Sequence, residues 1–260
     1  MKTLAAVLAL NLLSWSAMAA TIEPSAPRVC ETKAPGFTPT MVELYTSEGC
    51  DSCPPADRWL AQWPGGEGEL KVIPLAFHVS YWDALGWRDP FAHADFDARH
   101  NQMAWASGGR RLYTPQVFVD GSEALDWRKP AAFAQRAQAA GARPAGARLA
   151  ARWQLVGDTL ELQLAGTLAK GSARLELAVV ESGLETAVER GENAGKRLRH
   201  DHVVRLWREL GPLQSGDFET TERLVLPAGV RPEQARLVAW IAGTGPGAVR
   251  AALTAALHCT

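Results

Sequence analysis

Residues 41–55 are Met41-Val42-Glu43-Leu44-Tyr45-Thr46-Ser47-Glu48-Gly49-Cys50-Asp51-Ser52-Cys53-Pro54-Pro55. The first six residues alternate between apolar and polar side chains, which favours a β-strand. The two prolines, followed by apolar side chains at helical spacing, predict a helix over residues 54–63. Two cysteines separated by two residues therefore lie between a strand and a helix. This placement favours a redox-active dithiol, with a structural disulfide or half of a metal site as alternatives.

The rest of the first half continues this alternation of strands and helices. Residues 71–79 form an apolar run that predicts a second strand. Asp89-Pro90 has the form of a helix start, and Gly108-Gly109 the form of its end. Pro115 opens a third predicted strand over residues 115–119, and Pro130 opens a last helix. We therefore expect an α/β domain over residues 41–143, with a mixed sheet.

The second half of the chain has a different pattern. Residues 141–146 contain two glycines and a proline, which predicts a connector. Residues 148–156, 159–168 and 173–180 then alternate apolar and polar side chains, with turns predicted at Gly157-Asp158 and Lys170-Gly171. More strand-like runs follow up to residue 257, the last of which also fits a helix. We expect an antiparallel β-sandwich-like domain over residues 147–260.

The N-terminus has the features of an export signal. Lys2 precedes an apolar run, and Ala17-Met18-Ala19 is a typical cleavage site, so residues 1–20 are predicted to be a signal peptide and residues 21–40 an N-terminal extension. We expect a periplasmic or secreted protein. No later run is long and apolar enough to span a membrane. With 27 basic and 28 acidic side chains, the chain lacks the basic surface of a nucleic-acid-binding protein.

All four cysteines lie in the part expected to be exported, where disulfides persist. Cys30 and Cys259 lie near opposite ends of the mature chain. Because the termini of compact proteins are often close together, a structural Cys30–Cys259 disulfide is favoured over two free thiols.

Several residues near the dithiol are candidates for its chemistry. Cys50 is expected to be the attacking thiol and Cys53 the resolving one, although Asp51 disfavours a thiolate beside it. His78 closes the second predicted strand at the same edge of the sheet, where it could orient substrate. Trp82 follows it and could line a peptide-binding groove. The main alternative is a copper or zinc site formed by the two thiols and His78.

Tyr113-Thr114-Pro115-Gln116, followed by a strand, resembles the thioredoxin pattern in which a cis-proline loop faces the dithiol. This resemblance implies that the α/β domain over residues 41–143 is thioredoxin-like. The resemblance implies that Thr114 offers backbone hydrogen bonds to substrate and that Pro115 packs on the sulfur atoms. It also implies that Glu43, on the strand leading to the dithiol, accepts the proton of Cys53. An ordinary edge-strand proline and an arginine-paired or solvated glutamate are the corresponding alternatives.

Taken together, the motifs resemble the exported bacterial, thioredoxin-like family catalogued as domain of unknown function 1223. The resemblance covers nearly the whole mature chain and rests on residues 42–50, Cys53-Pro54-Pro55-Ala56-Asp57, Phe77-His78-Val79, Tyr81-Trp82-Asp83, Leu85-Gly86-Trp87, Tyr113-Thr114-Pro115-Gln116, Gly191-Glu192-Asn193 and His200-Asp201-His202-Val203-Val204-Arg205. It implies a fold and a compartment but no substrate.

The sequence therefore favours an exported thiol–disulfide oxidoreductase that uses Cys50 and Cys53, without a cofactor or bound metal. Its partner is expected to be a protein or a small thiol or disulfide. The alternatives are a copper- or zinc-binding protein that also uses His78, and a non-catalytic binding module with a structural Cys50–Cys53 bridge. Because one fold hosts many functions, fold alone does not decide among them.

Overall fold

The computed structural model describes residues 28–64, 72–109, 111–125, 127–140, 143–243 and 249–259. The predicted signal peptide, most of the connector's first half and the glycine pair at 65–66 lie outside these residues. Among the described residues, none of the helices combines the length and apolar character needed to cross a membrane.

The first half of the chain alternates between strands and helices. Its elements are β1 (Val29–Lys33), β2 (Thr40–Thr46), α1 (Pro54–Leu60), β3 (Val72–His78), the 3-10 turn η1 (Asp83–Leu85), α2 (Ala94–Ala106), β4 (Gln116–Val119), β5 (Ser122–Glu123) and α3 (Pro130–Ala140). β2 and β3 are parallel, and β4 runs antiparallel to β2.

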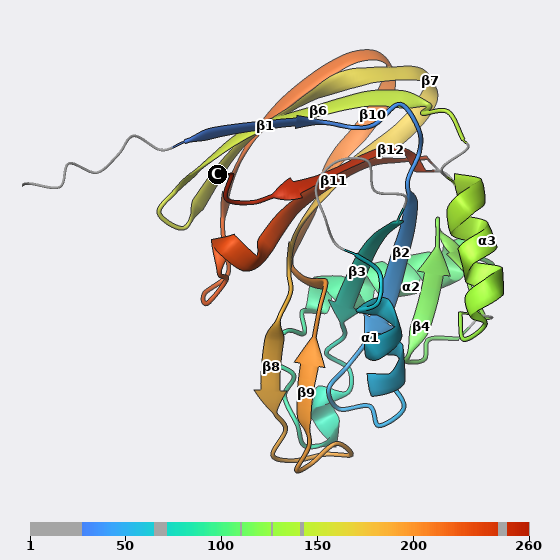
Figure 1. Cartoon of the computed structure of the whole chain (residues 1–260), viewed down its shortest axis with the longest axis vertical. Helices are drawn as coiled ribbons and strands as arrows, with labels where there is room; N and C mark the ends of the chain where they lie inside the picture. The colour runs from blue at the N-terminus through green and yellow to red at the C-terminus, as the bar shows by residue number, and fades with distance from the viewer. Residues whose placement is uncertain are drawn as a thin grey trace, which may run out of the picture.

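The second half consists of strands, two of which are long. Its elements are β6 (Ala147–Val156), β7 (Thr159–Glu181), β8 (Leu184–Ala187), β9 (Arg197–His200), β10 (Val203–Val225), the 3-10 turn η2 (Pro232–Gln234), β11 (Ala235–Gly243) and β12 (Val249–Ala256). Figure 1 shows β6, β7 and β10 curving over β11 and β12, while the β8–β9 hairpin extends to the side of α1.

A single mixed sheet of ten strands runs through both halves. Its main order is β1-β6-β7-β10-β3-β2-β4-β5, and β11 joins β7 with β12 outside it. β10 pairs with β3 where Val203 lies beside Ala76, and the N–H of Ala76 donates to the carbonyl of His202 at 2.7 Å. β1, from the N-terminal extension, pairs with β6 over five residues. The two halves therefore share one backbone hydrogen-bond ladder.

This topology corrects the predicted fold class. The expected α/β thioredoxin-like domain followed by a separate antiparallel β-sandwich-like domain is wrong, because the large mixed β-sheet is continuous and helices are few. Alternation within a strand indicates which side chains share a face but not which distant strand it will pair with. The pairing of β3 with β10 was therefore not visible in the sequence pattern.

The hydrophobic core follows from this sheet. α1 and α3 cover one face of β2, β3 and β4, and α2 covers the other face (Figure 1). The α2 side joins the halves, because Phe77 and Phe118 lie in one buried cluster with Val204 and Trp240. A second large cluster fills the curved β6–β12 part of the sheet. Because helices cover both faces of β2 and β3, apolar side chains lie on both faces of these strands.

Two predicted element boundaries differ from the structure. α2 begins after His93, whose ring accepts a hydrogen bond from the N–H of Asp95, rather than at Asp89. The carboxylate of Asp89 is instead bound inside the protein. The predicted break at Lys170-Gly171 lies within the continuous strand β7, where Gly171 has a φ of +78°. The extra residues of this irregularity lie on β7, where residues 169–171 face the single residue Ser215 of β10.

Candidate functional site

The Cys50–Cys53 pair forms a disulfide at the start of α1, with Cys53 as the N-cap residue. The loop that carries it leaves the end of β2 and turns back, with the N–H of Cys50 donating to the carbonyl of Ser47 at 3.2 Å. Both cysteines have 0% exposed surface, although Asp51 and Ser52 between them are exposed. Ser52 Oγ lies 3.4 Å from Cys50 Sγ. The disulfide is therefore just below the surface and covered.

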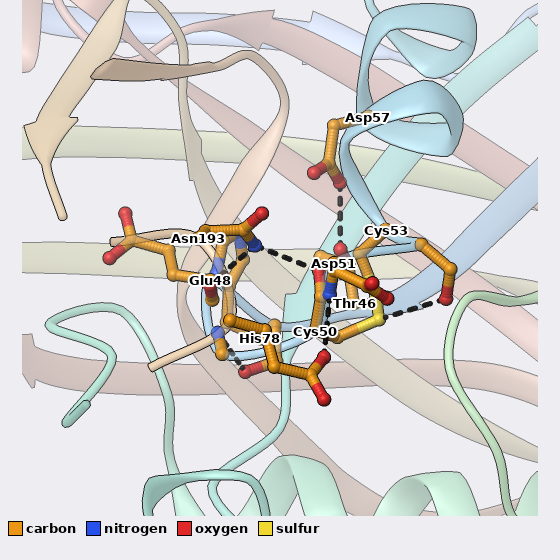
Figure 2. The surroundings of a disulfide bond; sticks show 12 residues. Thr46, Glu48, Cys50, Asp51, Cys53, Asp57, His78 and Asn193 are labelled. Carbon is orange, nitrogen blue, oxygen red and sulfur yellow. Dashed lines mark hydrogen bonds between the residues drawn. A yellow bond between two sulfur atoms is a disulfide. The ribbon is translucent and has the colours of Figure 1, made fainter. Parts of the chain in front are cut away.

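The loop between β8 and β9, residues 188–196, holds the dithiol segment in place. The side-chain amide of Asn193 donates to the carbonyl oxygens of Glu48 at 2.8 Å and Cys50 at 2.9 Å (Figure 2). The carboxylate of Glu192 accepts a hydrogen bond from the N–H of Asp51 at 3.0 Å. Asn193 itself is fully buried. Three backbone groups of the segment 48–51 thus depend on this loop.

A buried ion pair lies beside the dithiol loop. His78 Nδ1 lies 2.7 Å from Asp89 Oδ2, and the same oxygen accepts the N–H of Glu48 at 2.8 Å. Burial acts to lower the pKa of His78, but the Asp89 carboxylate outweighs it and raises that pKa above its ordinary value. Burial acts to raise the pKa of Asp89, but His78 and the N–H groups of Glu48 and Phe91 lower it overall. His78 therefore carries its charge more readily than a free histidine.

Glu48 connects this ion pair to the β8–β9 hairpin. Its carboxylate oxygens lie 3.0 Å from His200 Nε2 and 2.8 Å from the indole nitrogen of Trp87, which donates to it. The rings of His78 and His200 are 4.9 Å apart and nearly perpendicular. Within the described part of the chain, His78 Nε2 and His200 Nδ1 are buried and have no hydrogen-bond partner. Polar groups from β3, β9 and the dithiol loop thus meet in one buried cluster.

Glu43 does not lie with this cluster. Side chains alternate along β2, so Glu43 faces α2, on the side opposite to α1. It accepts hydrogen bonds from Arg99 at 2.9 and 3.0 Å and from the hydroxyl of Tyr45 at 3.0 Å. Arg99 also pairs with Glu176 of β7. Glu43 is therefore not placed to accept the proton of Cys53, which corrects that prediction.

Asp57 is the acid that the structure places on the dithiol side. It follows Cys53 by four residues on α1, and its carboxylate accepts a hydrogen bond from Thr46 Oγ1 at 2.8 Å (Figure 2). Residues four apart share one face of a helix. Burial raises the pKa of Asp57, whereas His200 and His78 act in the opposite direction. Asp57 can therefore hold a proton near the dithiol more readily than an exposed aspartate.

The remaining predicted substrate-binding residues lie around the same loop. The Thr114–Pro115 peptide bond is cis, and Gln116 after it pairs with Tyr45 of β2. Because β4 is antiparallel to β2, this bond lies beside the end of β2, from which the dithiol loop begins. In the described residues, Thr114 Oγ1 and Trp82 Nε1 are buried without a hydrogen-bond partner. Trp82 Cβ lies 3.1 Å from the position that a Cβ on Gly49 would occupy, so it packs directly on the dithiol loop.

The arrangement of ligand-type side chains also bears on the metal alternative. Across the described ranges, no group of three or more His, Cys, Asp or Glu side chains is arranged to hold a metal ion. His78 is turned toward Asp89.

Sequence reasoning missed several residues of this site. It assigned no role to Asp57, Glu192 or Asn193, and it took Asp89 for a helix cap. The Gly191-Glu192-Asn193 motif of the family resemblance was the available signal, but the separation of 143 residues between Asn193 and Cys50 concealed the contact. A local pattern cannot show contacts that depend on the path of distant strands.

We expect the His78–Asp89 pair to give a pH-dependent contribution to stability. Because the folded pKa of His78 is raised, its contribution is full below about pH 6.5 and is lost as the pH rises through the folded pKa. Because the folded pKa of Asp89 is lowered, the contribution of Asp89 to stability is full above about pH 3.9 and is lost as the pH falls through the folded pKa. The destabilisation by Asp89→Asn, measured by urea unfolding, should therefore be larger at pH 5.5 than at high pH.

A matched control is Asp95→Asn, which alters a solvent-exposed pair with His93. Its effect on the free energy of unfolding should stay below about 1 kcal/mol. NMR titration of the His78 ring provides an independent check, since Asp89→Asn should lower its pKa. An unchanged His78 titration in that variant would contradict the assigned cause.

Comparisons with known proteins agree with the topology but bring no activity. A family model described as "Protein of unknown function (DUF1223)" matches residues 41–242. A crystal structure of a protein from Agrobacterium tumefaciens is similar with a TM-score of 0.60 and 24% identity, covering 87% of this chain and 98% of that one. HBP35 of Porphyromonas gingivalis is similar with a TM-score of 0.62 and 15% identity, covering 86% and 76%. No curated protein matches the sequence.

Proposed function

The chain belongs to this family of proteins of unknown function, and we propose that it is an exported thiol–disulfide oxidoreductase working through Cys50 and Cys53. One observation carries the proposal: these two cysteines form a disulfide across only three positions, whereas Cys30 and Cys259 are 229 positions apart. On the chain-entropy model a disulfide stabilises by about 5 kcal/mol for the long loop but only about 2 kcal/mol for the short one. Stabilisation of the fold therefore accounts less well for the Cys50–Cys53 disulfide than for the Cys30–Cys259 disulfide.

The proposed reaction is a two-step exchange. A substrate thiolate attacks Cys50 Sγ, which forms a mixed disulfide and releases Cys53 as a thiolate. A second substrate thiolate then attacks the substrate sulfur of the mixed disulfide, which releases Cys50 and leaves an oxidised substrate. Two electrons pass from two substrate thiols to the pair, and the two protons end on the cysteine thiols. The reverse sequence reduces a substrate disulfide.

The surroundings support distinct roles for the two sulfurs. Ser52 Oγ, next to Cys50 Sγ, can donate a hydrogen bond to the Cys50 thiolate. Asp57, in place of Glu43, is the candidate to take and return the proton of Cys53. Thr114, Pro115, Trp82 and His78 remain the candidates for substrate contact. Export is supported by the presence of two disulfides, which persist in oxidising compartments.

The covered position of both cysteines also fits a second function. A non-catalytic binding module would keep Cys50–Cys53 as a structural bridge, and 0% exposed surface is common for such a bridge. The two functions differ in whether the disulfide exchanges with thiols.

Trapping the mixed disulfide tests the proposal. In a Cys53→Ser variant, Cys50 has no resolving partner, so incubation with oxidised glutathione should leave one glutathione covalently bound at Cys50, as measured by mass spectrometry. A Cys50→Ser variant is the matched control, and it should bind little glutathione because Cys53 has the resolving role in the proposed reaction. The assigned roles would be contradicted if neither variant bound glutathione, or if both variants bound it equally.

A further inference from the structure

The structure leaves one feature of this site unexplained by thiol chemistry, namely that its disulfide is closed to solvent. Exchange requires an incoming sulfur to approach along the S–S bond, yet Cys50 and Cys53 expose 0% of their surface. Some part of the protein must therefore move before any thiol reacts. The candidate must contact the dithiol segment and be separable from the main sheet.

The β8–β9 hairpin meets both conditions. β8 and β9 pair only with each other and form their own two-stranded sheet, apart from the ten-stranded one. The hairpin is joined to the body at its base, where β7 ends and β10 begins. Its tip, the 188–196 loop, reaches the dithiol segment (Figure 1). A hairpin held mainly at its base can move its tip without breaking the main sheet.

The contacts between tip and dithiol segment are few and polar. They are the two hydrogen bonds from the Asn193 amide and the one accepted by Glu192. The amide oxygen of Asn193 accepts a hydrogen bond from Lys196 within the same loop at 2.8 Å, which fixes the orientation of its amide. Each such hydrogen bond contributes modestly to stability, so three of them can break transiently.

Other contacts fix the hairpin base, and one packs against its tip. His200 pairs with Glu48, and Asp201 accepts the N–H of Gly183 at 2.9 Å. Gly191 in the tip has a φ of +76°, and Trp87 Cβ lies 3.2 Å from the position of an added Cβ there. Asn193 is thus the side chain by which the tip holds the carbonyl groups of Glu48 and Cys50.

We propose that the 188–196 loop determines which thiols react with the Cys50–Cys53 disulfide, with Asn193 as the positioning residue that holds this cover closed. This inference rests on the proposed function. Small thiols need only a slight displacement of the tip, whereas a polypeptide thiol needs the loop to leave the dithiol segment. The site is therefore selective for small thiols until the cover opens.

The test compares reduction rates in variants of the full chain. Asn193→Asp keeps the size of the side chain and the oxygen that accepts from Lys196, but it loses the donor to Glu48 and Cys50. Disulfide reduction is followed by thiol counting with two probes, dithiothreitol and reduced ribonuclease A. We expect the rate with reduced ribonuclease A to rise about tenfold and the rate with dithiothreitol to rise less. Glu185→Gln, which alters an exposed hairpin pair with Arg197, is the matched control and should leave both rates unchanged.

The outcomes separate this inference from the proposed function. If Asn193→Asp remains folded by circular dichroism and both rates stay within about twofold of the parent, the inference is overturned. If Asn193 had only a structural role, the substitution would change both rates equally. This outcome would also overturn the inference. If the variant does not fold, Glu192→Ala replaces it, since it removes the exposed acceptor of the Asp51 N–H, and the ratio of the two rates should still shift. The proposed function fails instead if the parent pair has the potential of a structural bridge, whatever the variants show.

Discussion

Replacement of Arg99 by methionine is expected to lower the free energy of unfolding by about 3–5 kcal/mol. The guanidinium is buried between Glu43 and Glu176, and its pKa is raised because these carboxylates outweigh the effect of burial. It also lies 4.8 Å from the centre of the Trp207 ring. The substitution leaves two buried carboxylates without their cation, and breaking a buried ion pair costs more than the pair itself contributes.

Two further variants make this test specific. Arg152→Met removes an exposed arginine that pairs with the exposed Glu31, and it should cost less than about 1 kcal/mol. Glu43→Gln and Glu176→Gln, added to Arg99→Met, should restore much of the loss, because no uncompensated charge then stays buried. Equilibrium urea unfolding gives all these values. A loss in Arg99→Met no larger than in Arg152→Met would show that the cluster does not join β2, α2 and β7 energetically.

Removal of the Cys30–Cys259 disulfide in a Cys30→Ser/Cys259→Ser variant is expected to lower the free energy of unfolding by about 2–5 kcal/mol. Cys30 lies on β1 at one edge of the branched sheet, and Cys259 follows β12 at the end of the branch formed by β11 and β12. The bond therefore fixes the two ends of the sheet to each other and constrains nearly the whole unfolded chain.

The control for this effect is the short disulfide. Cys50→Ser/Cys53→Ser should lower the free energy of unfolding by less, about 2 kcal/mol or below, because the loop it closes is short. Thermal unfolding of both double variants under the same conditions gives the comparison. If the short disulfide contributed as much as the long one, Cys50–Cys53 would have the properties of a structural bridge.

The sequence predicted local elements better than it predicted their assembly. A strand was predicted over residues 41–46 and a helix over residues 54–63, and the structure has β2 over Thr40–Thr46 and α1 over Pro54–Leu60. Membership of the family of unknown function is confirmed by the match over residues 41–242, whereas the exported character expected from the resemblance stays a prediction. The predicted fold class was wrong, because β10 joins the sheet of the first half where Val203 lies beside Ala76, and this pairing depends on the path of the whole chain. No local period carries that information.

The site was predictable only where it is local in sequence. The dithiol itself and the Thr114-Pro115 loop stand out by composition and spacing. Glu43 was given a role at the dithiol, but strand alternation places it on the other face, where Arg99 of α2 binds it. Asn193 makes its contacts with Cys50 across most of the chain, and only the three-dimensional structure shows them. Buried polar partners of this kind are specified by tertiary packing rather than by neighbours.

The reduction potential of the Cys50–Cys53 pair tests the proposed function most directly. It is measured by counting thiols and assigning them by peptide mass after equilibration in glutathione and dithiothreitol buffers of known potential. A working oxidoreductase requires a reversible transition between about −120 and −270 mV, and this is the predicted result. A pair that stays oxidised until the buffer falls below about −300 mV would contradict the proposal and identify the disulfide as a structural bridge.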